Sequence, residues 1–181
     1  MTFDQNMLKT KNQKKITKIR LKNIGLYYLQ RFESSVQNLR DVLKRRVDKY
    51  AFSNPQFDKT QAYAWIEELL EDFQRLNYLN DERYALMKIN DFLSVGKSAK
   101  YIKMKLMSKG IEAKTVEALM EQCEYDPKAL ALKLAEKKKI GPYRKADEER
   151  KKYFKKDMGI LLRAGFDYET VCDIMRQELE N

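Results

Sequence analysis

The stretch Gly110-Ile-Glu-Ala-Lys-Thr-Val-Glu-Ala-Leu-Met120 has an equivalent later in the chain, Gly165-Phe-Asp-Tyr-Glu-Thr-Val-Cys-Asp-Ile-Met175. Both read glycine, apolar, acid, two variable residues, Thr-Val, two variable residues and an apolar pair. A looser third copy begins at Phe57-Asp58 and has Gln56 in the place of the glycine. Internal repeats of this kind predict an array of similar helical units, and such arrays usually act as extended binding surfaces. The repeat therefore favours a binding protein over an enzyme.

The composition supports a folded, helical chain. Of the 181 residues, 43% are hydrophobic, and only six are glycine and three are proline. β-branched residues are sparse beside Lys, Leu, Glu, Ala and Met, which favours helices. We therefore predict an all-α fold, an elongated array of three tandem three-helix repeats built as helix-turn-helix-like units. The predicted segments are a flexible basic arm over residues 1–18 and repeats over residues 19–79, 80–124 and 125–181.

Capping residues predict where the helices begin and end. Ser34 or Ser35, Asn80 and Ser98 offer N-cap oxygens, and Asp126-Pro127 is a strong helix start. Gly96, Gly110 and Gly165 each close a helix, and Gly110 is expected to have a positive φ. The sequence also predicts a loop over residues 48–56 and a last helix that ends near residue 179.

Positive charge is concentrated in two stretches of a chain whose net charge is +10. Residues 1–25 hold seven Lys or Arg against one acid, and residues 137–156 hold ten against three. This pattern predicts contact with a polyanion. The expected contact residues are Lys97, Lys100, Lys103, Lys105, Arg144, Lys145, Arg150, Lys151 and Lys152.

Several functional classes are excluded or disfavoured by what the sequence lacks. Without histidine the chain has no Ser-His-Asp or Cys-His triad and no His-ligated zinc. No apolar run approaches the ~20 residues needed to span a bilayer, and the Lys-rich N-terminus is not followed by the apolar core of a secretory signal. Cys123 and Cys172 are expected to be free, packed thiols in the reducing cytoplasm.

The stretch Leu79-Asn-Asp-Glu-Arg-Tyr-Ala85 and the segments Gly96-Lys97-Ser98 and Lys109-Gly110-Ile111 resemble the RecX family of recombinase regulators. The first repeat has the family's Ser, Leu, Leu helix at Ser35, Leu39 and Leu43. The resemblance covers about residues 20–178. The chain departs from the family pattern at Asn80, where an Asp is expected, and at Ser98-Ala99, in place of Gly-Pro.

The resemblance implies a specific activity. Similar proteins are crescent-shaped three-repeat modules that lie in the groove of a RecA filament on single-stranded DNA. They inhibit filament extension, strand exchange, ATP hydrolysis and co-protease action in DNA repair and the SOS response. The expected partners are therefore the RecA filament and its single-stranded DNA, with no membrane, no cofactor and no catalytic residue, and we expect a monomer.

Two other functions are compatible with parts of the sequence. A sequence-tolerant single-stranded nucleic-acid binder that acts without RecA could stack bases on tyrosines beside the lysines. The tyrosines in question are Tyr27, Tyr28, Tyr101, Tyr143 and Tyr153, and core or rim packing is the preferred role of the first two. A metal-dependent nuclease could use the carboxylates of Glu67, Glu68, Glu71 and Asp72, although helical spacing indicates an exposed, solvated face.

A third use of the three-helix units, reading DNA with a recognition helix, is disfavoured. The third helices carry Glu112, Glu117 and Glu121 in one copy and Asp167, Glu169 and Asp173 in the other. Acidic helices are repelled by the major groove, whose readers use Arg, Asn or Gln.

Overall fold

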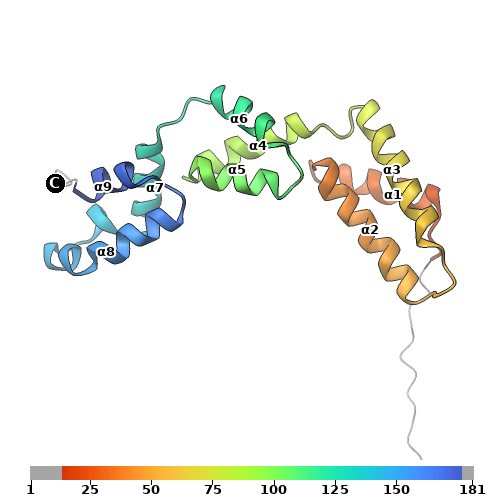
Figure 1. Cartoon of the computed structure of the whole chain (residues 1–181), viewed down its shortest axis with the longest axis horizontal. Coiled ribbons are helices and arrows are strands. Elements are labelled where there is room, and N and C mark those ends of the chain that lie inside the picture. Colours follow the sequence, from red (N-terminus) through yellow and green to blue (C-terminus); the bar gives the residue numbers. More distant parts are fainter. Residues whose placement is uncertain (1–13, 177–181) are drawn as a thin grey trace, which may run out of the picture. The chain divides into compact units, whose positions relative to one another are not determined.

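A computed structural model describes residues 14–176 of the chain, and within that range every regular element is a helix. The chain forms two compact units, unit 1 up to Leu79 and unit 2 from Asn80. Unit 1 contains α1 (Lys18–Leu29), α2 (Val36–Phe52) and α3 (Lys59–Arg75) (Figure 1). Unit 2 contains α4 (Asp81–Ser94), α5 (Ala99–Met107), α6 (Ala113–Glu121), α7 (Pro127–Lys138), the 3-10 turn η1 (Gly141–Tyr143), α8 (Asp147–Arg163) and α9 (Tyr168–Arg176). The predicted all-α fold is confirmed.

The helix starts follow the predicted capping chemistry. The Ser35 hydroxyl accepts a hydrogen bond from the Asn38 amide at 3.1 Å, and Ser98 does the same for Tyr101 at 3.2 Å. Asp126 caps α7 in the same way, with Pro127 as its first residue. These side chains bond amides that the helix itself leaves unpaired, which fixes the helix starts to single residues.

The core of unit 1 shows that the loop predicted over residues 48–56 is wrong in its first half. Helix α2 continues to Phe52, because Val47 and Ala51 extend its buried stripe by two more turns against α3. Asp48 lies on the side of α2 and accepts hydrogen bonds from Lys59 at 2.8 Å and from Tyr63 at 2.5 Å. The hydrogen bonds from Lys59 and Tyr63 hold the pKa of Asp48 below its ordinary value.

The last residues of the arm predicted over 1–18 belong to the folded part of unit 1. Ile16 is 4% exposed and packs in the core of unit 1. Thr17 caps α1 by accepting a hydrogen bond from the Arg20 amide. Folded structure therefore includes at least the last three residues of the predicted arm 1–18, whereas residues 1–13 and the predicted helix end near residue 179 lie outside the described residues.

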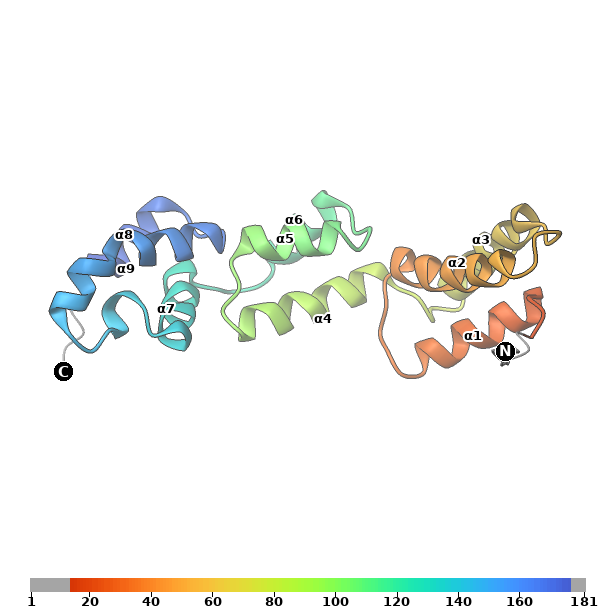
Figure 2. The same ribbon diagram turned by 90° about the horizontal axis from the view of Figure 1, so that it is seen from below.

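Unit 2 has two apolar clusters, one in α4–α6 and one in α7–α9. Figure 2 shows the helices of these two groups as ribbons. The repeated valines Val116 and Val171 are both 0% exposed, as the eleven-residue repeat predicts for core positions. Leu93 of α4 packs against both clusters. The two groups of helices therefore share apolar contacts within one compact unit.

A hydrogen bond also joins the two helix groups of unit 2. The Ser98 hydroxyl, which caps α5, donates to the carbonyl of Ala164 at the end of α8 at 2.7 Å. Gly165 follows with a φ of +94°, and a Cβ on it would lie 2.6 Å from Ser98 Oγ. Gly110, its counterpart in the repeat, has a φ of +83° but is exposed. The two glycines therefore share a backbone conformation, and only Gly165 also allows a close approach.

We expect Gly165→Ala to lower the free energy of unfolding by about 1–3 kcal/mol, because it adds strain at positive φ and displaces the Ser98 hydroxyl. Gly110→Ala is the matched control, since it adds the same kind of backbone strain at an exposed position. Thermal unfolding followed by circular dichroism measures both. Equal losses in the two variants would show that the Ser98 contact adds nothing.

Cys123 and Cys172 are free and half-buried. Within residues 14–176 no helix combines the length and the apolar character needed to cross a membrane.

Candidate polyanion-binding surface on α8

The basic stretch of residues 137–156 is organised around one buried acid that the sequence analysis missed. Asp157 of α8 is 0% exposed. Its carboxylate accepts hydrogen bonds from Arg144 Nε at 2.6 Å, from Arg144 Nη2 at 2.8 Å and from the Gly141 amide at 3.0 Å. The paired bonds from one guanidinium make a strong, directional contact. These hydrogen bonds hold the segment before α8 against the middle of that helix.

The charge state of Asp157 follows from its neighbours. Burial alone would raise the pKa of Asp157, because it disfavours the charged form. The hydrogen bonds from Arg144 and Gly141 and the positive charges of Arg144 and Lys156 outweigh burial, so that the pKa lies below its ordinary value of 3.8. Asp157 is therefore a carboxylate at neutral pH.

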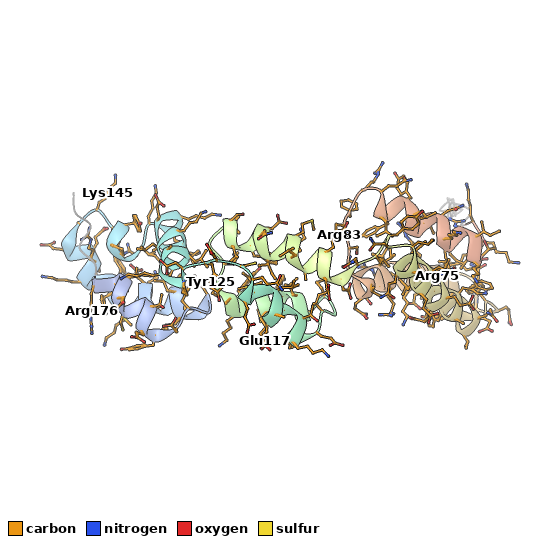
Figure 3. The ribbon with its side chains drawn as sticks, turned by 90° about the horizontal axis from the view of Figure 1, so that it is seen from above. Arg75, Arg83, Glu117, Tyr125, Lys145 and Arg176 are labelled. Carbon is orange, nitrogen blue, oxygen red and sulfur yellow. The ribbon has the colours of Figure 1, made fainter. Side chains whose placement is uncertain are left out.

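Arg150 is also tied to the protein. Its guanidinium donates to the Pro142 carbonyl at 2.9 Å and to the Arg144 carbonyl at 3.1 Å. Of the five predicted contact residues between 144 and 152, Arg144 and Arg150 thus hold the chain in place. Lys145, Lys151 and Lys152 are exposed, and Lys145 lies at the outer edge of unit 2 in Figure 3.

The exposed face of α8 carries a row of four lysines, Lys151, Lys152, Lys155 and Lys156, which we call the lysine row. All four are exposed, and none forms an ion pair with a described carboxylate. They form two pairs at i and i+4, Lys151 with Lys155 and Lys152 with Lys156. Like charges at this spacing cost a helix about 0.2–0.5 kcal/mol per pair. A bound polyanion would remove that repulsion.

A tyrosine lies at the edge of the lysine row. Three cations approach the ring of half-buried Tyr153: Arg144 at 4.5 Å, Lys152 at 5.4 Å and Lys156 at 5.6 Å from its centroid. Cations attracted to an aromatic face are held close to the helix surface. Tyr153 therefore fixes part of the lysine row in place.

The four lysines predicted around α5 have different surroundings. Lys97 lies 4.8 Å from the ring of Tyr101, and Lys103 pairs with Glu117 of α6. Lys100 and Lys105 are exposed without a described acidic partner. The structure thus places two of the four in local contacts and leaves two on the surface.

The candidate surface includes three residues of α8 that the sequence analysis did not select, Lys155, Lys156 and Asp157. Lys155 and Lys156 could have been found, because they follow Lys151 and Lys152 at helical spacing. Asp157 could not, because nothing in the local sequence distinguishes an acid clamped by an arginine 13 residues earlier from a solvated one.

Three of the four carboxylates considered for a nuclease site form ion pairs with nearby cations. Glu67 pairs with Arg40 at 3.0 Å, Glu68 with Lys18, and Asp72 with Arg75 at 2.6 Å. Among residues 14–176 no cluster of three or more potential metal ligands occurs.

Of the two N-terminal tyrosines, Tyr28 packs against the core of unit 1 as expected, and Tyr27 does not. Tyr28 is half-buried, and its hydroxyl accepts a hydrogen bond from Asn38 Nδ2 at 2.9 Å. Tyr27 is 56% exposed at the rim, with Arg31 over its ring.

Comparison with known proteins supplies the family. No protein-family model matches the chain. The regulatory protein RecX of Myxococcus xanthus is 34% identical over 163 residues, which are 87% of this chain and 85% of that protein. RecX of Agrobacterium fabrum is 27% identical and covers 88% of this chain and 83% of its own length.

Solved structures agree at the level of the fold. The crystal structure of RecX from Lactobacillus salivarius matches 89% of this chain and 96% of its own, with a TM-score of 0.63 and 22% identity. A second crystal structure of a regulatory protein RecX matches 88% of this chain and 73% of its own, with a TM-score of 0.67 and 20% identity. Together with the 34% identity across most of both chains, this likeness means that the chain belongs to the RecX family of regulatory proteins.

Proposed function

We propose that this chain binds RecA and its filament on single-stranded DNA and inhibits its recombinase, ATPase and co-protease activities. The observation that carries the proposal is the 34% identity to a regulatory protein RecX across most of both chains. The protein acts in the cytoplasm as a monomer that needs no cofactor and catalyses no reaction. Its effect comes from occupying the filament.

The lysine row supplies the chemistry for the DNA part of this function. Four exposed ammonium groups on one helix can each approach a phosphate of a single strand. Neutralising four phosphates of a single strand gives log K a slope of about −3 against log salt. Binding that weakens by about 50-fold between 50 and 200 mM salt is therefore expected from this surface alone.

RecA-catalysed ATP hydrolysis on single-stranded DNA, with this protein titrated from far below one copy per RecA protomer, tests the proposal. We expect inhibition. Complete inhibition at a protein concentration far below that of RecA would indicate a block of filament growth. Inhibition that needs nearly equal concentrations of the two proteins would indicate binding along the filament. No inhibition at equal amounts would overturn the proposal.

A parallel titration of labelled single-stranded DNA without RecA separates the proposal from its nearest alternative. A RecA-independent nucleic-acid binder would bind the naked strand as tightly as the filament. Its inhibition of the RecA ATPase would be relieved by excess single-stranded DNA. Cleavage of the labelled strand in the presence of Mg²⁺ would identify a nuclease instead.

A further inference from the structure

The outer face of α5 exposes apolar side chains that the core does not use. Met104 is 60% exposed and Met107 is 47% exposed, whereas Ile102 and Leu106 on the opposite side are buried. With Lys100, the two methionines form a stripe at i, i+4 and i+7. This is the spacing at which one helix face contacts a partner.

A groove runs beside this stripe. It has a volume of about 560 Å³ and lies between α5, α6 and the connection to α7, where Figure 3 shows Tyr125. Its apolar lining includes Val116, Met120 and Pro127. Lys100 and Lys103 line it from α5, and Lys100 also belongs to the stripe, so the groove and the stripe adjoin at this residue.

The charge of the surface limits what can bind there. Helix α5 carries three lysines and no acid. Lys103 is paired with Glu117, which leaves Lys100 and Lys105 on either side of Met104 without a described carboxylate. The groove also carries the acids Glu117 and Glu121, so its charges balance and the excess positive charge lies on α5, at Lys100 and Lys105. Charge complementarity on α5 therefore calls for a ligand with carboxylates flanking an apolar side chain.

The methionines distinguish this surface from the lysine row. Methionine side chains are flexible and polarisable, and they serve protein interfaces that adapt to an apolar partner. A phosphate backbone offers no apolar side chain to cover them. The lysine row of α8 suits phosphates, and the α5 surface suits a protein.

We propose that the outer face of α5 and its groove form a protein-docking surface that takes an acidic segment with an exposed apolar side chain. This inference rests on the proposed function, because it assigns α5 to the RecA protein and α8 to the DNA. The two contacts are then separable, and a variant can lose one while it keeps the other.

The variant Met104→Ala/Met107→Ala tests this division. Alanine preserves helix propensity, and both side chains are exposed, so the fold should be unchanged. We expect affinity for free RecA without DNA to fall about tenfold, which corresponds to ~1.4 kcal/mol. Affinity for a naked single strand should stay at the wild-type value. Lys100→Glu should weaken RecA binding by a similar factor.

Leu86→Ala/Val95→Ala is the matched control, because these residues of unit 2 are 39% and 45% exposed and lie outside α5. If the methionine variant binds RecA as tightly as this control, the α5 proposal is overturned while the proposed function stands. If the wild-type protein itself fails to bind RecA, both are overturned. Equal losses for RecA and for naked DNA in the methionine variant would also overturn the separation of surfaces.

Discussion

Replacement of Asp157 by alanine is expected to lower the free energy of unfolding by about 3–5 kcal/mol. The buried carboxylate accepts three hydrogen bonds, two from Arg144 and one from the Gly141 amide. Removing one partner of a buried ion pair leaves the other charge poorly compensated, which is why the cost exceeds that of a surface pair. Asp157→Asn keeps the shape but lacks the charge, so its loss should be smaller.

Two measurements check the Asp157 prediction. Urea unfolding followed by circular dichroism gives the loss in free energy, and tryptophan fluorescence reports on unit 1 alone, because the single tryptophan is Trp65 in α3. Hydrogen exchange of the Gly141 amide should accelerate strongly in the variant. An unchanged unfolding curve together with an unchanged Gly141 exchange rate would contradict a stabilising role for the Asp157 hydrogen bonds.

The same carboxylate predicts a pH dependence. The pKa of Asp157 is lowered in the folded protein, so its contribution to stability is fully present above the unfolded value of 3.8. That contribution is lost as the pH falls from this value through the lower folded-state pKa. The stability difference between wild type and Asp157→Asn should therefore be constant from about pH 5 to 8 and shrink below about pH 4.

Charge reversal in the lysine row, Lys151→Glu/Lys155→Glu, is expected to weaken binding to the RecA filament on single-stranded DNA by about 30-fold or more at about 100 mM salt. Two phosphate contacts are lost, and two carboxylates are placed beside the backbone. The slope of log K against log salt should become shallower by about 1.4, since each single-strand phosphate contributes about 0.7. Fluorescence anisotropy of a labelled strand at several salt concentrations measures both quantities.

The control for this charge reversal is Lys49→Glu/Lys114→Glu. It makes the same change in net charge at exposed lysines of α2 and α6. An equal loss in the control would mean that overall charge, and not the lysine row, determines binding. Wild-type affinity and an unchanged salt slope in Lys151→Glu/Lys155→Glu would remove α8 from the DNA-binding surface.

The parts of the fold that the sequence predicted are those set by local chemistry. The capping oxygens of Ser35 and Ser98 and the positive φ of Gly110 affect only the adjacent turn of a helix. They can therefore be recognised from the neighbouring residues in the sequence. The end of α2 was misjudged because Asn54-Pro55 marked a loop, whereas burial of Val47 and Ala51 against α3 extends the helix almost up to it. Tertiary packing decided that boundary.

The candidate site was predictable only in part for a similar reason. Charge density located the stretch that contains Lys151 and Lys152. It could not separate these exposed lysines from Arg144 and Arg150, whose guanidinium groups are bound to Asp157 and to backbone carbonyls. Which cations remain available to a ligand depends on contacts between residues far apart in the sequence.

The hydroxyl of Ser98 has a consequence for how this chain can change in evolution. It caps one helix and bonds the end of another 66 residues later, while Leu93 packs into both apolar clusters of unit 2. A deletion of residues 125–181 would remove a hydrogen bond and an apolar contact from the helices that precede them. The last helix group of unit 2 therefore cannot be lost without a cost to the other, even though the sequence repeats.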